Sequence, residues 1–63
     1  MLGPEEVSGK TSSEIYALLE AEYADDTYAI NYIRESKNDP YYETEELKHG
    51  AAMGIVIYAG LIF

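Results

Sequence analysis

The chain has 63 residues, of which 12 are Asp or Glu and 4 are Lys or Arg, so its formal net charge at pH 7 is −8. This excess of carboxylates excludes direct binding of DNA, RNA or an anionic membrane surface, because phosphate binding uses clustered Lys and Arg. It favours a basic surface on a partner protein. Domains below about 70–80 residues usually need a disulfide, a metal or a partner, and this chain has no Cys. We therefore expect a homo-oligomer or a subunit of a complex, without a cofactor.

Three parts make up what we expect to be one small domain over residues 1–63. Residues 1–10 are an irregular lead-in, residues 11–49 an acidic helical part, and residues 50–63 an apolar segment without a charge. The lead-in has room for one helical turn, with Pro4 at its first position and Glu5 near its positive end. Its first residues lack the basic start and the apolar run of a secretory signal. This predicts a cytoplasmic protein, in the host cell cytoplasm if it is viral.

Thr11-Ser12-Ser13-Glu14 has the pattern of a capping box, in which Thr11 caps a helix and Glu14 reaches back to the Thr11 amide. Apolar side chains then recur at helical spacing, at Ile15, Leu18, Leu19 and Tyr23. The pattern predicts a helix over residues 12–24 that turns these side chains toward the core.

A second helix is predicted over residues 27–37, with Asp26 suited to cap its start and Lys37 placed near its negative end. Its inner stripe is Ala29, Ile30 and Ile33. The alternation of Tyr28, Ile30 and Tyr32 also fits a strand. Because the run up to Lys37 continues the helical pattern, we favour the helix.

Asp39-Pro40 predicts the start of a third helix, since Asp caps helices and Pro suits their first position. This helix either ends at Gly50, leaving Gly54 to Phe63 as a strand rich in Ile and Val, or continues to the C-terminus. A lone strand would need a second extended segment, so the continuous helix requires fewer assumptions. The predicted fold class is all-α, a small bundle of three helices of which the last is long and apolar. The alternative is α+β, with a C-terminal strand after Gly50.

The apolar segment carries a second pattern, because Gly50 and Gly54 have the GxxxG spacing that lets two helix backbones approach closely. We expect an oligomer interface at this spacing, formed by Gly50, Gly54, Ile55, Tyr58 and Ile62. A membrane-spanning helix needs roughly 20 apolar residues, whereas the uncharged run here covers residues 50–63. Membrane association is therefore the alternative to burial in an interface.

Carboxylates and tyrosines supply the predicted partner-binding surface. Tyrosine combines rigid apolar area with a hydroxyl and is enriched in binding surfaces, and this chain has seven. The residues expected to contact a partner are Glu14, Glu20, Glu22, Asp25, Asp26, Glu43, Glu45, Glu46, Tyr23, Tyr41 and Tyr42. The predicted function is that of a non-catalytic inhibitor, of the kind that phages encode, which presents nucleic-acid-like carboxylates to a basic site. The alternative is a structural subunit of a larger assembly, anchored by the apolar segment.

Glu46-Leu47-Lys48-His49 is an ExxH sequence, which places a carboxylate and an imidazole on one helical face as in di-iron carboxylate bundles. The stretch from Glu46 to Met53 also resembles the ExxHG…AM pattern of light-harvesting chlorophyll-binding helices, in which His ligates the pigment. Ala51 stands where that family has an arginine. The resemblance implies a metal- or pigment-binding helical subunit as a second alternative, with Glu46 and His49 as ligands. The single His has no nucleophile motif beside it, so we predict no catalytic residue and no enzyme activity.

Overall fold

The two helices with strong capping signals begin where the sequence predicts. The computed structural model describes residues 2–62, and of Ile62 only the backbone. Helix α2 (Ser12–Glu22) starts after the predicted capping box, in which Thr11 Oγ1 accepts from the Glu14 amide at 3.3 Å and Glu14 Oε1 accepts from the Thr11 amide at 3.1 Å. Helix α3 (Thr27–Lys37) starts after Asp26, whose Oδ1 accepts from the Ala29 amide at 3.1 Å.

The prediction for the end of α2 is wrong by two residues, because the chain turns before Ala24. The Tyr23 amide still donates to the Leu19 carbonyl, but the Tyr23 carbonyl accepts from the Asp26 amide at 3.0 Å and closes a tight turn. This turn positions Asp26 as the cap of α3. The two helices therefore form a hairpin with a very short connection.

The start of the last helix is also predicted wrongly. Asp39-Pro40 forms a β-turn, in which the Asp39 carbonyl accepts from the Tyr42 amide at 3.2 Å and Asp39 Oδ1 accepts from the Tyr41 amide at 2.9 Å. Proline is favoured at the second position of such turns for the same fixed φ that suits a helix start. Helix α4 (Glu45–Ile62) begins five residues later, with Thr44 Oγ1 accepting from the Leu47 amide at 3.2 Å.

Helix α4 continues through Gly50, so the alternative of a C-terminal strand is wrong for the residues that the structure describes. A helix-ending glycine needs positive φ, and the only glycine with positive φ among residues 2–62 is Gly9, at 81°. Continuing the helix buries Ala52 and Val56 against the rest of the core. The described chain is all-α, as predicted.

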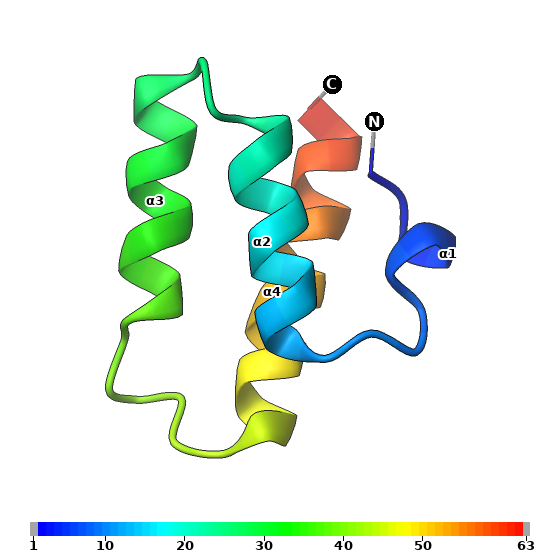
Figure 1. Cartoon of the computed structure of the whole chain (residues 1–63), viewed down its shortest axis with the longest axis vertical. Helices are drawn as coiled ribbons and strands as arrows, with labels where there is room; N and C mark the ends of the chain where they lie inside the picture. The colour runs from blue at the N-terminus through cyan, green and yellow to red at the C-terminus, as the bar shows by residue number, and fades with distance from the viewer. Residues whose placement is uncertain (1, 63) are drawn as a thin grey trace.

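The long helices pack in two layers, and α1 (Pro4–Val7) covers part of α4. In Figure 1, α2 and α3 stand side by side in antiparallel directions, and α4 runs behind them from the bottom of the view to the top. Helix α2 contacts both α3 and α4. The core is formed by Val7, Ile15, Tyr16, Leu19, Ile33, Ala52 and Val56.

Val7 is the one core side chain that comes from the predicted lead-in, residues 1–10. The single turn of α1 begins with Pro4 at its first position, as predicted, and buries Val7 completely. Among residues 2–62, no helix has the length and apolarity that a membrane crossing requires.

Candidate functional site

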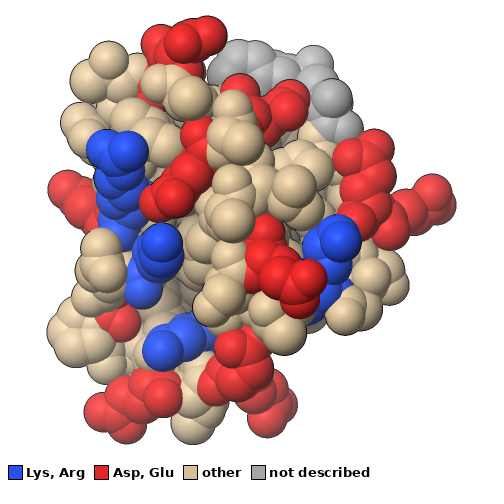
Figure 2. Space-filling view, viewed as in Figure 1, with Lys and Arg blue, Asp and Glu red and all other residues tan. Residues whose placement is uncertain are grey.

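Six of the predicted carboxylates lie at the two ends of the molecule. We call Glu22, Asp25 and Asp26 the turn carboxylates, because they lie at or beside the α2–α3 turn at the top of Figure 1. We call Glu43, Glu45 and Glu46 the α4-start carboxylates, and they lie near the bottom of the same view. Figure 2 shows acidic side chains at the top, along both sides and at the bottom of this face, with the basic side chains among them. On this face the acidic side chains are spread out and do not form one single patch.

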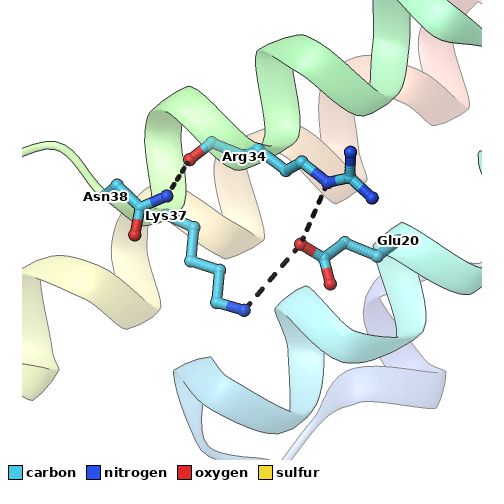
Figure 3. A network of polar contacts seen from close by, with 4 residues as sticks. All are labelled: Glu20, Arg34, Lys37 and Asn38. Atoms are coloured by element: carbon cyan, nitrogen blue, oxygen red, sulfur yellow. Dashed lines mark hydrogen bonds and ion pairs between the residues drawn. The ribbon is translucent and has the colours of Figure 1, made fainter.

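Glu20 lies between these ends and is held by two cations of α3. Glu20 Oε1 is 4.0 Å from Arg34 Nε and 3.8 Å from Lys37 Nζ (Figure 3). Asn38 Nδ2 donates to the Arg34 carbonyl at 3.0 Å and closes the end of α3 beside this pair. Surface ion pairs of this kind contribute little to stability, at most about 1 kcal/mol. Glu20 thereby neutralises part of the positive charge of α3.

Glu45 joins the starts of two helices. Its Oε2 accepts from the Ser12 amide and its Oε1 accepts from the Ser12 hydroxyl, both at 2.7 Å. Ser12 is the first residue of α2 and is 3% exposed, so this carboxylate satisfies a buried helix start. The Ser12 amide, and then the Ser12 hydroxyl, lower the pKa of Glu45. A residue predicted to bind a partner therefore has a structural role between α2 and α4.

Two further predicted carboxylates are helix caps. Glu14 completes the capping box, and the hydrogen bond from the Thr11 amide lowers its pKa. Asp26 caps α3 with Oδ1. Asp25, Glu43 and Glu46 are exposed and take part in none of these cap or interhelix contacts.

The predicted partner-binding tyrosines fall into two places. Tyr41 and Tyr42 follow the turn after α3, and their rings meet edge to face with centroids 5.3 Å apart. Tyr23 lies at the end of α2, where burial and then the neighbouring Glu22 carboxylate raise the pKa of its hydroxyl. The structure separates Tyr23 from Tyr41 and Tyr42 by the length of α3. The three tyrosines therefore do not form one surface.

Tyr23 instead forms part of a groove between α3 and α4 that the sequence analysis did not identify. The groove has a volume of about 540 Å³ and is lined by Tyr23, Asp26, Tyr28, Ala29, Tyr32, Ile33, Ile55, Tyr58 and Ala59. We call it the tyrosine groove. Tyr28 and Tyr32 lie four residues apart on α3 and therefore on one side of that helix. That spacing was a signal in the sequence, which we interpreted only as a competing strand pattern.

The outer side of α4 is a second apolar surface. Ile57, Tyr58 and Leu61 are 49, 66 and 82% exposed, whereas Val56 beside them is 1% exposed. Of the predicted interface residues, Gly50 and Gly54 are exposed, Ile55 is half-buried, and the side chain of Ile62 lies outside the description. A Cβ added at Gly50 or Gly54 would meet no atom within 4 Å. No other helix of the described chain therefore packs closely against these two glycines. Their role in an oligomer stays a prediction.

Glu46 and His49 lie one turn apart near the start of α4, where Glu46 is exposed and His49 is half-buried. Among the described residues, no group of three or more His, Cys, Asp or Glu side chains is arranged to hold a metal ion. No protein-family model matches the chain, and neither the curated proteins nor the solved structures give a significant match.

Proposed function

We propose that the protein is a non-catalytic binding module that engages a basic surface of a partner protein through exposed carboxylates at both ends of the α2–α3 hairpin. The observation that carries the proposal is how the charges are distributed. Two of the four basic side chains, Arg34 and Lys37, are held by the single carboxylate of Glu20. Asp25, Glu43 and Glu46 are exposed and outside such contacts. A positively charged partner therefore meets carboxylates whose charge is little compensated.

The spacing of this charge supports the more specific proposal, that the partner site normally holds nucleic acid. The chain has eight net negative charges and a longest dimension of 28 Å, or one charge per about 3.5 Å. Duplex DNA has one charge per about 1.7 Å of helix axis with both strands counted, so this chain has about half the linear charge density of a duplex. A protein surface with such an excess of negative charge attracts the Lys and Arg side chains that bind phosphates.

The test uses the exposed carboxylates and leaves the structural ones in place. Replacing Glu20 or Asp26 would disturb an interhelix contact or a helix cap, so the informative variant is Asp25→Asn, Glu43→Gln, Glu46→Gln. The assay is displacement of a fluorescent DNA duplex from a panel of basic DNA-binding domains. We expect the wild-type protein to displace DNA from at least one member, and the displacement to weaken strongly from low to physiological salt, where the screening length is about 8 Å. The triple variant should displace DNA less well.

The matched control is Glu5→Gln, Glu6→Gln, Glu35→Gln, which changes the net charge equally at exposed positions that are not among the predicted partner-binding residues. It should retain more activity than the test variant. The proposal is wrong if no member of the panel releases DNA at any salt concentration. It is also wrong if the test variant displaces DNA as well as the wild-type protein does.

A second candidate function, that of a structural subunit, is supported by the outer side of α4. Exposed apolar side chains at Ile57 and Leu61 are suited to an interface with a second copy or a larger assembly. Removing the tail after Gly54 would delete the buried Val56 and unfold the protein, so point substitutions are needed. Under this function, the wild-type protein sediments as a discrete oligomer and Ile57→Gln, Leu61→Gln sediments as a folded monomer. A monomeric wild-type protein at concentrations up to the millimolar range would exclude self-assembly through this surface.

A further inference from the structure

The tyrosine groove combines aromatic rings from three parts of the fold with one negative charge. Tyr28 and Tyr32 come from α3, Tyr58 from α4 and Tyr23 from the end of α2. Tyr28, Tyr32 and Tyr58 are 85, 59 and 66% exposed, which is unusual for side chains with so much apolar area. Asp26 is the only charged residue among those that line the groove. The groove therefore pairs aromatic rings with a carboxylate.

Aromatic rings attract cations because the ring face carries negative charge density, and this attraction adds to that of a nearby carboxylate. The chain as a whole is also strongly acidic, with a net charge of −8. We propose that the tyrosine groove binds one positively charged side chain, of Arg or Lys, from a segment of a partner protein. The cationic head lies beside Asp26 and among the tyrosine rings.

The dimensions of the groove fit a whole side chain together with the backbone that carries it. Its volume of about 540 Å³ lies within the range of about 300–1,000 Å³ that is typical of ligand sites. Ile33 and Ile55 line the groove and provide apolar contact for the methylene groups of Arg or Lys. Asp26 uses Oδ1 to cap α3, so its second oxygen is suited to accept from the cation.

This inference rests on the proposed function for the source of the side chain, a basic partner, but not for the binding itself. The two use different residues. Partner binding through the ends of the molecule depends on Asp25, Glu43 and Glu46, whereas the groove depends on Asp26 and the tyrosines. Either one can therefore fail while the other holds.

The experiment measures binding of two short peptides that differ only in charge. The probes are acetyl-Gly-Arg-Gly-amide and the same peptide with citrulline, the neutral analogue of Arg, titrated into the ¹⁵N-labelled protein at low salt. We expect the arginine peptide to shift amide signals of the residues that line the groove, and to bind roughly 3- to 30-fold more tightly than the citrulline peptide. A lysine peptide and its acetylated form provide the second matched pair.

Two isosteric substitutions then locate the charge. Asp26→Asn removes the negative charge but keeps a residue that caps helices well, so α3 is retained. Asp25→Asn changes the net charge equally at the adjacent position, which does not line the groove. We expect Asp26→Asn to weaken binding of the arginine peptide several-fold, and Asp25→Asn to have much less effect on this binding.

Two substitutions at Tyr28 then test the ring. Both Tyr28→Phe and Tyr28→Leu remove the hydroxyl, but only the first keeps an aromatic face. Because Tyr28 is 85% exposed, neither should unfold the protein, and thermal unfolding checks this. We expect binding of the arginine peptide to survive in Tyr28→Phe and to fall several-fold in Tyr28→Leu.

Three results would overturn the inference. Equal affinity for the arginine and citrulline peptides would make the groove a general apolar surface. Equal loss in Asp25→Asn and Asp26→Asn would reduce the effect to the overall charge of the protein. Signal shifts confined to residues outside the groove would place the cation elsewhere. None of these results depends on the DNA displacement assay, so the proposed function is judged separately.

Discussion

Helices α2 and α4 differ in how deeply their side chains are buried, and the difference is the opposite of what their sequences suggest. Helix α2 includes several charged and polar residues, yet it buries three large side chains, Ile15, Tyr16 and Leu19, to 3% exposure or less. Helix α4 has no charge after Lys48, yet its fully buried side chains are Ala52 and Val56. Its larger side chains Ile57, Tyr58 and Leu61 remain exposed. A helix can be the most apolar part of a chain without being its most buried part.

The reason lies in how two helices share one interface. The side chains of two close-packed helices interdigitate, and large ones on one helix fit well against small ones on the other. Helix α2 supplies the large ones, such as Ile15 and Leu19, and α4 supplies Ala52 and Val56. Met53 and Ile55 of α4 pack partly against the core, whereas Ile57, Tyr58 and Leu61 lie on the opposite side of that helix and remain exposed. The surplus apolar surface of α4 is thus available for binding.

The largest expected effect contrasts one leucine from each helix. Leu19→Ala should lower the free energy of unfolding by about 2–5 kcal/mol, because it leaves a cavity in the core. A protein of this length has a total free energy of unfolding of roughly 3–9 kcal/mol, so this variant should lose a large part of its stability. Leu61→Ala should change the free energy by at most about 0.5 kcal/mol, since Leu61 is 82% exposed. Urea unfolding followed by circular dichroism measures both, and equal losses would contradict the contrast.

An intermediate effect is expected where the two helices meet, at the contact of Ser12 with Glu45. The pKa of Glu45 is lowered from its ordinary value of 4.5 in the folded state. Its carboxylate therefore stabilises the fold at pH above that value, and the contribution is lost as the pH falls through the folded pKa. Glu45→Gln should lower the melting temperature at pH 7, and this difference from the wild-type protein should shrink toward pH 2 as Glu45 binds a proton.

The control for that experiment is Glu46→Gln, which removes a charge from the same turn of α4 but leaves the Ser12 contact in place. It should have a smaller effect at pH 7. A difference between the wild-type protein and Glu45→Gln that persists unchanged at pH 2 would show that the contact acts through shape and not through charge.

The smallest expected effect is a gain in stability on the exposed side of α4. Gly54→Ala should raise the free energy of unfolding by about 0.5–1 kcal/mol, because it improves helix propensity and the new Cβ meets nothing within 4 Å. Gly9→Ala is the matched control. It should lower the free energy of unfolding by about 1 kcal/mol or more, because Gly9 has a φ of 81°, which a residue with a Cβ rarely adopts. If Gly54→Ala lowers stability in a concentration-dependent way, the glycines pack closely in an oligomer.

The sequence allowed the fold to be predicted where local signals act alone. The capping box at Thr11 and the cap at Asp26 each determine a helix start through hydrogen bonds within a few residues. The helix start predicted at Asp39-Pro40 was wrong because these residue types suit both a helix start and a β-turn. Gly50 left the course of the last segment open, and burial of Val56 by helices distant in sequence favours the helix there.

The binding surfaces were harder to predict, because they depend on which helices become neighbours. Glu20 and Glu45 look like ordinary surface carboxylates in the sequence, and only the packing of α2 against α3 and α4 gives them partners. The tyrosine groove likewise requires Tyr58 of α4 to lie opposite Tyr28 and Tyr32 of α3. The spacing of those two was visible in the sequence, but the third ring could not be placed without the fold.

The contact of Glu45 with Ser12 has a consequence for the rates of folding and unfolding. It joins residues 33 positions apart, whereas the hydrogen bond between Tyr16 and Ser36 within the α2–α3 hairpin joins residues 20 apart. Closing the shorter loop costs less chain entropy, so we expect the hairpin to form first and α4 to dock afterwards. Contacts made after the transition state slow unfolding without speeding folding. The contact of the Glu45 carboxylate should therefore form late in folding and lower the rate of unfolding, which lengthens the lifetime of the folded state.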